Sequence, residues 1–247
     1  MTEKKRPIAI EVKDVSISYR ILNNVSIRKT LFHKKQRNEV FEAVKHVSFE
    51  VEEGGILGII GKNGSGKSTL LRSMAGVFSP NSGTIDLHDR SVSLMALGVG
   101  FKPELTGRAN AILSGMLLGF KEKEVEERMD SIIDFSEIGD FIDRPVRTYS
   151  SGMHSKLAFA ISAMLETDIM LVDEVLSVGD ERFRTKSMSK MRELITDAER
   201  TVVIVSHDIP VLEELCDRIL WIHEGEMMDI DKPEIVLPKY VEFMKEN

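Results

Sequence analysis

The sequence predicts an α/β fold with a mostly parallel sheet, an N-terminal antiparallel β part and an inserted α-helical subdomain. Three observations lead to this prediction. Short apolar runs at residues 56–60, 169–172 and 201–206 are typical of buried parallel strands, and amphipathic helical segments lie between them. The first run leads into a glycine-rich loop and a helix start. Residues 108–165, by contrast, follow a helical pattern throughout.

The N-terminal third reads as strands. Residues 8–19 alternate loosely between apolar and polar side chains, which predicts an edge strand, and residues 41–51 resume the alternation. Residues 79–83 form a turn signal, and residues 84–87 and 91–97 are expected to be short strands.

Helical periodicity then takes over. The helical block, expected at about residues 98–165, carries two apolar stripes: Val125, Met129, Ile132 and Ile133, then Met153, Leu157, Ala160, Ile161 and Met164. Another helix is expected to carry Phe183, Met188, Met191, Leu194 and Ile195. A strand pair around Trp221 and a short helix after Pro233 end the chain.

The glycine-rich loop matches the pattern G-x-x-x-x-G-K-[ST] at every fixed position. Such a loop turns its backbone N–H groups and the following helix N-terminus toward phosphate oxygens. Lys67 supplies a cation for the β- and γ-phosphates, and the Ser68 hydroxyl is a candidate ligand for Mg²⁺. We therefore predict that a nucleoside triphosphate binds the residues Gly61, Asn63, Gly64, Ser65, Gly66, Lys67, Ser68 and Thr69.

Composition indicates a single globular domain spanning residues 1–247. The 247 residues are 42% hydrophobic and 30% charged, with a formal net charge of −7, which argues against non-specific nucleic-acid binding. No run approaches the roughly 18 apolar residues of a membrane span, and we expect no signal peptide. Cys216 stands among apolar residues, so we expect a buried thiol in a reducing compartment.

Polar residues follow two of the predicted buried strands. Asp173 and Glu174 end the run at 169–172, and His207 follows the run at 201–206. Parallel strands that carry a phosphate loop deliver such residues to the same sheet edge. We predict Asp173 as a Mg²⁺ ligand, Glu174 as the general base for the attacking water and His207 as a γ-phosphate contact. The other five histidines show no ligand spacing and receive no metal role.

Residues 149–153, Tyr-Ser-Ser-Gly-Met, precede the second helical stripe. Taken alone they are an ordinary helix N-cap, although hydroxyls and a glycine at a helix start also suit an anion.

As an ordered set, these motifs resemble the nucleotide-binding domain of ABC transporters over about residues 8–230. The resemblance implies a head-to-tail homodimer in which Ser150, Ser151 and Gly152 of one subunit touch the γ-phosphate on the other. It also implies that Tyr19 stacks on adenine and that residues 177–180, ending at Asp180, link the two sites.

Two departures narrow the resemblance. The family motif Leu-Ser-Gly-Gly-Gln is replaced at residues 149–153, and the usual glutamine is missing near Ala96, so its role has no evident owner. Both departures resemble those found in the branch of the family that exports bacterial cell-surface polysaccharides. Within this branch, the chain is most similar to ATP-binding subunits of teichoic acid exporters. O-antigen or capsular polysaccharide export is the alternative within this branch. Some O-antigen exporters carry a further carbohydrate-binding domain, which we do not expect here because the sequence ends at Asn247.

Membership of this branch implies partners and a location. It implies two copies of a separate transmembrane permease, a lipid-linked glycopolymer as cargo, and a peripheral position on the cytoplasmic face of the membrane. A soluble ABC-type ATPase of DNA repair or translation is the alternative from another class. Such proteins usually carry two cassettes, a coiled coil or zinc cysteines, none of which occurs in this sequence. A nucleotide-gated protein without hydrolysis is disfavoured by Glu174 and His207.

Residues 21–40 interrupt the first two strands with five cations against Glu39, a charge of 5 − 1 = +4. By composition the segment is a solvated basic loop. A short helix is the alternative, since Ser26 can cap it and Ile27 and Leu31 lie one helical turn apart. The resemblance favours this helix, because ATPases of the polysaccharide-export branch carry an extra helix here, near the membrane entrance for the lipid-linked substrate.

Overall fold

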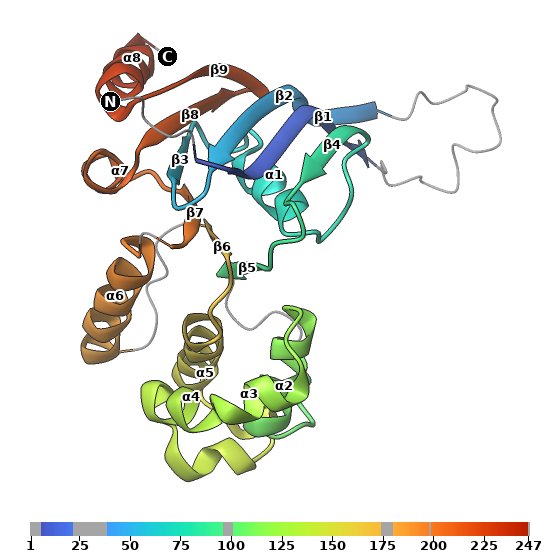
Figure 1. Cartoon of the computed structure of the whole chain (residues 1–247), viewed down its shortest axis with the longest axis vertical. Coiled ribbons are helices and arrows are strands. Elements are labelled where there is room, and N and C mark those ends of the chain that lie inside the picture. Colours follow the sequence, from blue (N-terminus) through green and yellow to red (C-terminus); the bar gives the residue numbers. More distant parts are fainter. Residues whose placement is uncertain (1–5, 22–38, 96–100, 174–179, 198, 247) are drawn as a thin grey trace, which may run out of the picture.

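A computed structural model of the chain describes residues 6–21, 39–95, 101–173, 180–197 and 199–246. Its β part consists of a six-stranded sheet in the order β5-β6-β7-β3-β8-β9 and a three-stranded sheet in the order β2-β1-β4. Figure 1 shows both sheets at one end of the molecule and helices α2 to α5 at the other.

The six-stranded sheet is parallel except at one edge. β3 lies between β7 and β8 and runs parallel to both, and β6 runs parallel to β5 and β7, whereas β9 pairs antiparallel with β8. The strands are β3 (Ile56–Ile60), β5 (Val92–Met95), β6 (Ile169–Asp173), β7 (Thr201–Val205), β8 (Arg218–His223) and β9 (Glu226–Asp231). The continuous apolar runs of β3, β6, β7 and β8 are buried on both faces, as the predicted mostly parallel sheet requires, whereas the edge strand β9 is largely exposed.

The N-terminal sheet is antiparallel, as expected, and consists of β1 (Ile8–Ile21), β2 (Glu39–Glu52) and β4 (Ser82–Asp86). The prediction that the first strand lies at an edge was wrong, because β1 pairs with β2 on one side and with β4 on the other. Alternation in a sequence shows that one face of a strand is buried, but it does not show how many strands flank it.

Helix α1 (Lys67–Met74) packs between the two sheets. Its Leu70, Leu71 and Met74 join apolar residues of β1, β2, β3, β6 and β7 in one buried cluster. A second cluster covers the opposite face of the large sheet and includes residues of α6 (Glu181–Ile195), α7 (Ile209–Leu215) and α8 (Pro233–Glu246). Phe159 and Ala163 also join this cluster, which connects the sheet with the helical end of the molecule.

The helical block has a third core of its own. It contains α2 (Gly107–Leu117), α3 (Glu122–Glu127), α4 (Met129–Ser136) and α5 (Ser151–Met164), with 3₁₀ turns η2 (Gly139–Asp143) and η3 (Val146–Thr148). The stripe expected on one helix is divided between α3 and α4, with Arg128 at the junction. Val125, Met129 and Ile132 are nevertheless buried together, because the two short helices keep the apolar side chains on one side.

Some local expectations need correction. Helix α7 was not foreseen, although Asp208 accepts a hydrogen bond from the Val211 N–H and Pro210 stands in the first turn, which are both helix-start signals. The last helix, expected to be short, has 14 residues. Met188 of α6 is 40% exposed and does not share in the core.

Cys216 is buried, as expected, and burial raises the pKa of its thiol to about 12. None of the helices in the described ranges combines the length and apolar character needed to cross a membrane.

Candidate nucleotide site

Three neighbouring strands bring the predicted site residues to one sheet edge. β6, β7 and β3 are adjacent and parallel, so their carboxyl ends lie together. Gly61 follows β3, Asp173 ends β6, and Ser206 and His207 follow β7. Residues more than a hundred positions apart in the chain therefore meet here.

The glycine-rich loop runs between β3 and α1, and Gly66 caps the helix in a left-handed conformation with φ 104°. A Cβ atom on Gly66 would lie 2.1 Å from the Ala43 carbonyl oxygen of β2, so glycine permits this close approach. The buried Lys67 donates hydrogen bonds of 2.7 and 2.8 Å from Nζ to the carbonyl oxygens of Gly61 and Lys62. Its ammonium group is thus held inside the curve of the loop.

A cavity of about 220 Å³ lies against this loop. Six of its ten lining residues belong to the predicted phosphate loop and α1, and His207 is the seventh predicted site residue on its wall. The lining residues are Phe41, Ala43, Asn63, Gly64, Gly66, Lys67, Ser68, Thr69, Val205 and His207. The cavity is therefore bounded by the phosphate loop, by the end of β7 and by β2.

The site fits a phosphate group in a further respect. Ser65 is 4% exposed, and its Oγ atom has no hydrogen-bond partner among the described residues. A buried hydroxyl without a partner costs free energy, which an anionic oxygen beside the loop would relieve. Gly61 lies at the base of the loop, where an added Cβ would be 2.7 Å from that same Oγ atom.

The two predicted Mg²⁺ ligands are in direct contact, since Ser68 Oγ donates a 2.9 Å hydrogen bond to Asp173 Oδ1. A hydroxyl and a carboxylate at the end of a phosphate loop are the oxygen ligands that Mg²⁺ prefers. Glu174, the predicted base, lies outside the described residues, as do residues 177–179 and the stretch around Ala96.

The aromatic residue at the cavity differs from the one expected. Tyr19 and Phe41 are directly opposite each other on β1 and β2, yet Phe41 lines the cavity and Tyr19 does not. The Tyr19 ring instead meets Phe78 edge to face, with centroids 6.2 Å apart. The adenine role of Tyr19 stays a prediction, and Phe41, 49% exposed, is a competing candidate. The sequence offered one signal for Phe41, since this aromatic residue begins the strand predicted at residues 41–51.

Ser150, Ser151, Gly152 and Asp180 do not line this cavity. Ser150 caps α5 by accepting a 3.2 Å hydrogen bond from the Met153 N–H, as the simple N-cap interpretation predicts. Ser151 is exposed at the helix start. Asp180 caps α6 and forms an ion pair with Lys156, a residue that the sequence motifs did not single out.

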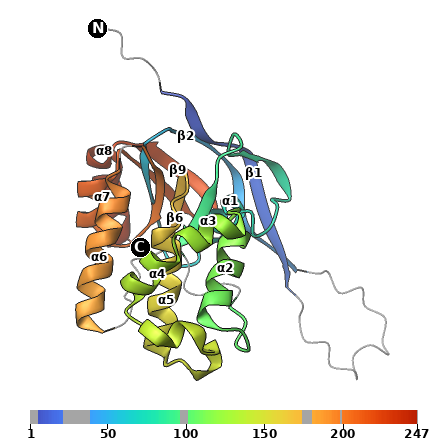
Figure 2. The same cartoon turned by 60° about the horizontal axis from the view of Figure 1, so that its bottom comes forward.

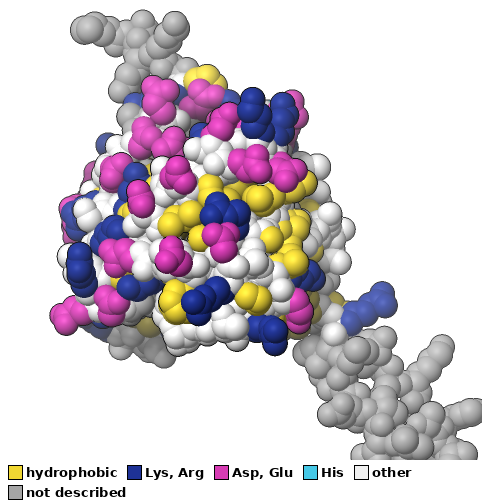
Figure 3. All heavy atoms as spheres, turned by 90° about the horizontal axis from the view of Figure 1, so that it is seen from below, with side chains coloured by type: hydrophobic (Ala, Val, Ile, Leu, Met, Phe, Trp, Pro, Cys, Tyr) yellow, Lys and Arg dark blue, Asp and Glu magenta, His cyan; other side chains and the backbone are white. Residues whose placement is uncertain are grey.

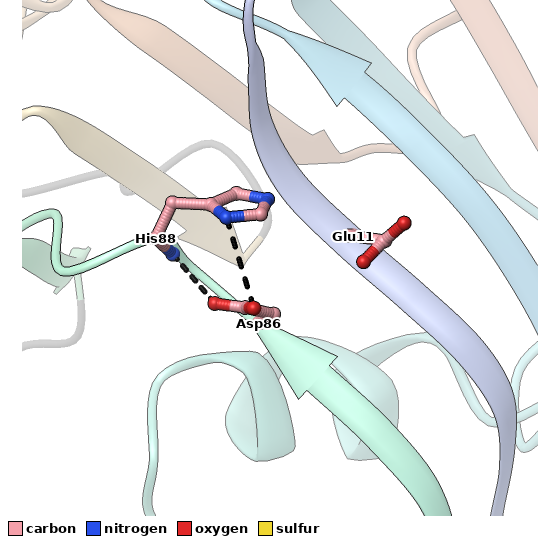
Figure 4. A group of neighbouring side chains, drawn as sticks. All are labelled: Glu11, Asp86 and His88. Carbon is pink, nitrogen blue, oxygen red and sulfur yellow. Dashed lines mark hydrogen bonds and ion pairs between the residues drawn. The ribbon is translucent and has the colours of Figure 1, made fainter.

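Elsewhere in the described ranges, one group of carboxylate and histidine side chains lies close enough together to be considered as a metal site. Glu11 of β1, Asp86 of β4 and His88 lie close together on the N-terminal sheet (Figure 4). Sequence spacing could not reveal this group, because strand pairing of Glu11 with Asp86 brings its members together. Asp86 and His88 are exposed, and Lys13 forms a 2.8 Å ion pair with Glu11. We assign no metal to it, since that lysine already neutralises one of the carboxylates.

Comparison with known proteins matches the family model described as ABC transporter to residues 44–177. The O-antigen export system ATP-binding protein RfbB of Klebsiella pneumoniae is 40% identical over 242 residues, covering 95% of this chain and 98% of that protein. The teichoic acids export ATP-binding protein TagH of Staphylococcus haemolyticus is 40% identical over 240 residues, covering 97% of this chain and 90% of its own length. Among solved structures, a dimeric ATP-binding cassette in a post-hydrolysis state, bound to ADP and Pi, aligns with a TM-score of 0.68. It is 23% identical and covers 91% of this chain and 98% of its own, a likeness that concerns the fold.

Proposed function

Because this chain belongs to the ABC transporter family of ATP-binding proteins, we propose that it is the ATP-hydrolysing subunit of an exporter for a lipid-linked cell-surface glycopolymer. The observation that carries the proposal is 40% identity, over nearly the full chain, to ATP-binding proteins of both O-antigen and teichoic acid export. Within this class we favour wall teichoic acid, because the sequence as a whole most resembles ATP-binding subunits of teichoic acid exporters. O-antigen or capsular polysaccharide is the alternative cargo.

The proposed chemistry begins with ATP in the cavity at the phosphate loop. Lys67 and the loop N–H groups hold the phosphates, and Phe41 offers its ring to the adenine. Ser68 and Asp173 would hold Mg²⁺, which supplies positive charge to the β- and γ-phosphate oxygens. Glu174 accepts a proton from the attacking water, and His207 donates a hydrogen bond to the γ-phosphate.

We propose that the full chain forms one nucleotide-binding domain that works as a head-to-tail homodimer. Ser150, Ser151, Gly152 and Asp180 stand apart from the subunit's own cavity, which suits an action on the partner's nucleotide. The exposed N-terminus of α5 offers N–H groups and the Ser151 hydroxyl to a γ-phosphate brought by the second subunit. Hydrolysis then requires both subunits, which couples the chemistry to closure of the dimer.

The proposed permease contact is a largely apolar cavity of about 410 Å³ between the end of α1, β5 and helices α2 and α5. Figure 3 shows apolar side chains gathered on the helical end of the molecule, with single charged residues between them. Exposed apolar residues of this part include Leu105, Met116, Leu117 and Phe141. A separate transmembrane permease in two copies would cover this surface and hold the ATPase at the cytoplasmic face of the membrane.

The test is an export measurement in the cells that make the protein. Lys67→Ala at the native locus is expected to remove glycopolymer from the cell surface while lipid-linked polymer accumulates inside. Polyol phosphate in the retained polymer would support teichoic acid, and phosphate-free sugar repeats would support O-antigen or capsule. Unchanged surface polymer in cells producing only Lys67→Ala protein would reject an export role. Co-purification with nucleic acid instead of a permease would favour a soluble ABC-type ATPase.

A further inference from the structure

Lys156 is a nearly covered cation at the meeting point of three helices. It lies on α5, one turn beyond Gly152, with 14% of its side chain exposed. Its Nζ atom is 2.7 Å from Asp180 Oδ2 and 3.6 Å from Glu137 Oε2, and it lies 4.9 Å from the centroid of the Phe183 ring. The ammonium group therefore joins α5 to the N-terminus of α6 and to the C-terminus of α4.

Both carboxylate partners are fixed by their own elements. Asp180 accepts a 2.9 Å hydrogen bond from the Phe183 N–H as the N-cap of α6. Glu137 is the left-handed C-cap of α4, with φ 58°, and Lys186 of α6 donates a 3.0 Å hydrogen bond to its Oε1. The pKa of the Asp180 carboxyl is lowered chiefly by Lys156, and that of Glu137 chiefly by Lys186, so both remain ionised at neutral pH. Lys156 thus bridges two anchored charges.

Aromatic side chains also pack α5 against α6. Phe159 of α5 and Phe183 of α6 meet edge to face at 6.2 Å, and Phe135 of α4 contacts both rings. Figure 2 shows α4, α5 and α6 gathered on one side of the molecule. Buried aromatic contacts hold the helices together, whereas ion pairs with exposed partners contribute little to the free energy of unfolding. The charge network is therefore better suited to fixing the angle and register of the helix ends than to stabilising the fold.

We infer that Lys156 is a positioning residue, which holds the α5 N-terminus at Ser151–Gly152 and Asp180 at the α6 N-terminus in a fixed relative position, so that both act together on the partner's nucleotide. The inference rests on the proposed function, in which both segments serve the second subunit. The phosphate loop of the same subunit is held by other contacts, since Lys67 bonds to its own loop and Ser68 to Asp173. Loss of Lys156 should accordingly impair hydrolysis by the dimer and leave nucleotide binding by each subunit unchanged.

The variants separate the ion pair from the helix cap. Lys156→Met removes the charge and keeps much of the apolar stem, and Lys156→Arg keeps the charge. Asp180→Ser retains an N-cap acceptor for the Phe183 N–H and loses the carboxylate. Lys190→Met is the matched control, since Lys190 on α6 pairs at 2.7 Å with Glu193 and its side chain is 20% exposed.

In full-length protein, we measure kcat for ATP, ATP affinity with a fluorescent analogue, and Tm. We expect Lys156→Met and Asp180→Ser each to lower kcat by about fivefold or more, the low end of typical coupling between sites. ATP affinity should stay within about twofold of wild type, as expected for groups outside the binding cavity. The double variant should be no slower than the slower single variant, because both changes break the same contact. Lys156→Arg should recover much of the loss, and Lys190→Met should match wild type.

Three results would overturn the inference. The first is a normal kcat in Lys156→Met, and the second is a kcat in the double variant that falls by the product of the two single losses. The third is a fall in kcat that is accompanied, in both Lys156→Met and Asp180→Ser, by a clear fall in ATP affinity and in Tm. Wild-type protein without ATPase activity or ATP-dependent dimerisation would instead reject the proposed function, and the inference with it. An active, dimerising wild type with a normal Lys156→Met variant rejects the inference alone.

Discussion

The Ser68 hydroxyl donates a 2.9 Å hydrogen bond to Asp173 Oδ1, joining the first turn of α1 to the end of β6 across 105 positions of sequence. The contact places the phosphate loop against the carboxylate edge of the sheet. The β- and γ-phosphates of a bound nucleotide would lie beside Ser68, at the end of the phosphate loop. The contact between Ser68 and Asp173 leads to the first prediction.

Asp173→Asn and Ser68→Ala should remove the effect of Mg²⁺ on ATP affinity. Loss of even an outer partner of a metal costs roughly 10- to 100-fold in metal affinity, and these residues are expected to be direct ligands. Titration with a fluorescent ATP analogue, with Mg²⁺ and with EDTA, measures the difference. Ser73→Ala is the control, because Ser73 lies on the same helix and bonds to the Phe78 carbonyl. Undiminished Mg²⁺ dependence in Asp173→Asn would remove that residue from the metal site.

Phe41 should contribute more to nucleotide affinity than Tyr19. Phe41 lines the cavity at the phosphate loop, whereas the Tyr19 ring packs edge to face on Phe78. By analogy with base stacking on aromatic residues, Phe41→Ala should cost roughly 1–3 kcal/mol of binding free energy. Phe41→Tyr should be mild, and each variant is compared with Tyr19→Ala by equilibrium ATP binding. A larger loss in a well-folded Tyr19→Ala protein would return the adenine role to Tyr19.

Glu174→Gln should bind ATP normally and hydrolyse it about 10²- to 10⁴-fold more slowly, the usual contribution of a positioned general base. The phosphate and metal contacts proposed for Lys67, Ser68 and Asp173 do not require this carboxylate, so we expect an ATP-bound dimer to accumulate. Steady-state turnover and size-exclusion chromatography with ATP measure both effects. Glu166→Gln, at an exposed position, serves as the control. Turnover near the wild-type rate would exclude Glu174 as the base.

A shared site predicts recovery of activity on mixing two inactive proteins. A Lys67 variant and a Ser151 variant are each expected to be inactive, since every site in either homodimer lacks one group. In a random 1:1 mixture, half of the dimers are mixed and each has one intact composite site, so about a quarter of wild-type sites return. ATPase activity before and after mixing gives the readout. No recovery despite demonstrated heterodimers would contradict the head-to-tail arrangement.

Residues 21–40 lie mostly outside the described residues, so their role stays a sequence-based prediction. Replacing Arg28, Lys29, Lys34, Lys35 and Arg37 by Gln should impair glycopolymer export in cells. Each cation near an anionic leaflet contributes on the order of 1 kcal/mol to attraction for lipid headgroups. ATP hydrolysis by the isolated subunit should hardly change, because none of these residues belongs to the nucleotide motifs. Normal export at normal protein levels would restore the solvated-loop interpretation.

The sequence alone was sufficient for the fold class and for most of the cavity wall. Strands β3, β6 and β7 are continuous apolar runs, and local spacing alone defines the phosphate loop. These features are encoded within short stretches, where backbone preferences and burial act on neighbouring residues. Asp173 and His207 could be predicted because each directly follows such a strand, and parallel strands end at a common edge.

Contacts between distant residues were decided only by the tertiary structure. The position of β1 inside its sheet depends on its pairing with β4. Only the folded structure shows that Phe41, and not Tyr19, lines the cavity at the phosphate loop. The Lys156–Asp180 ion pair likewise requires α5 and α6 to pack through Phe159 and Phe183. Local periodicity shows which side of an element is buried, whereas its neighbour is determined by the packing of whole elements into shared cores.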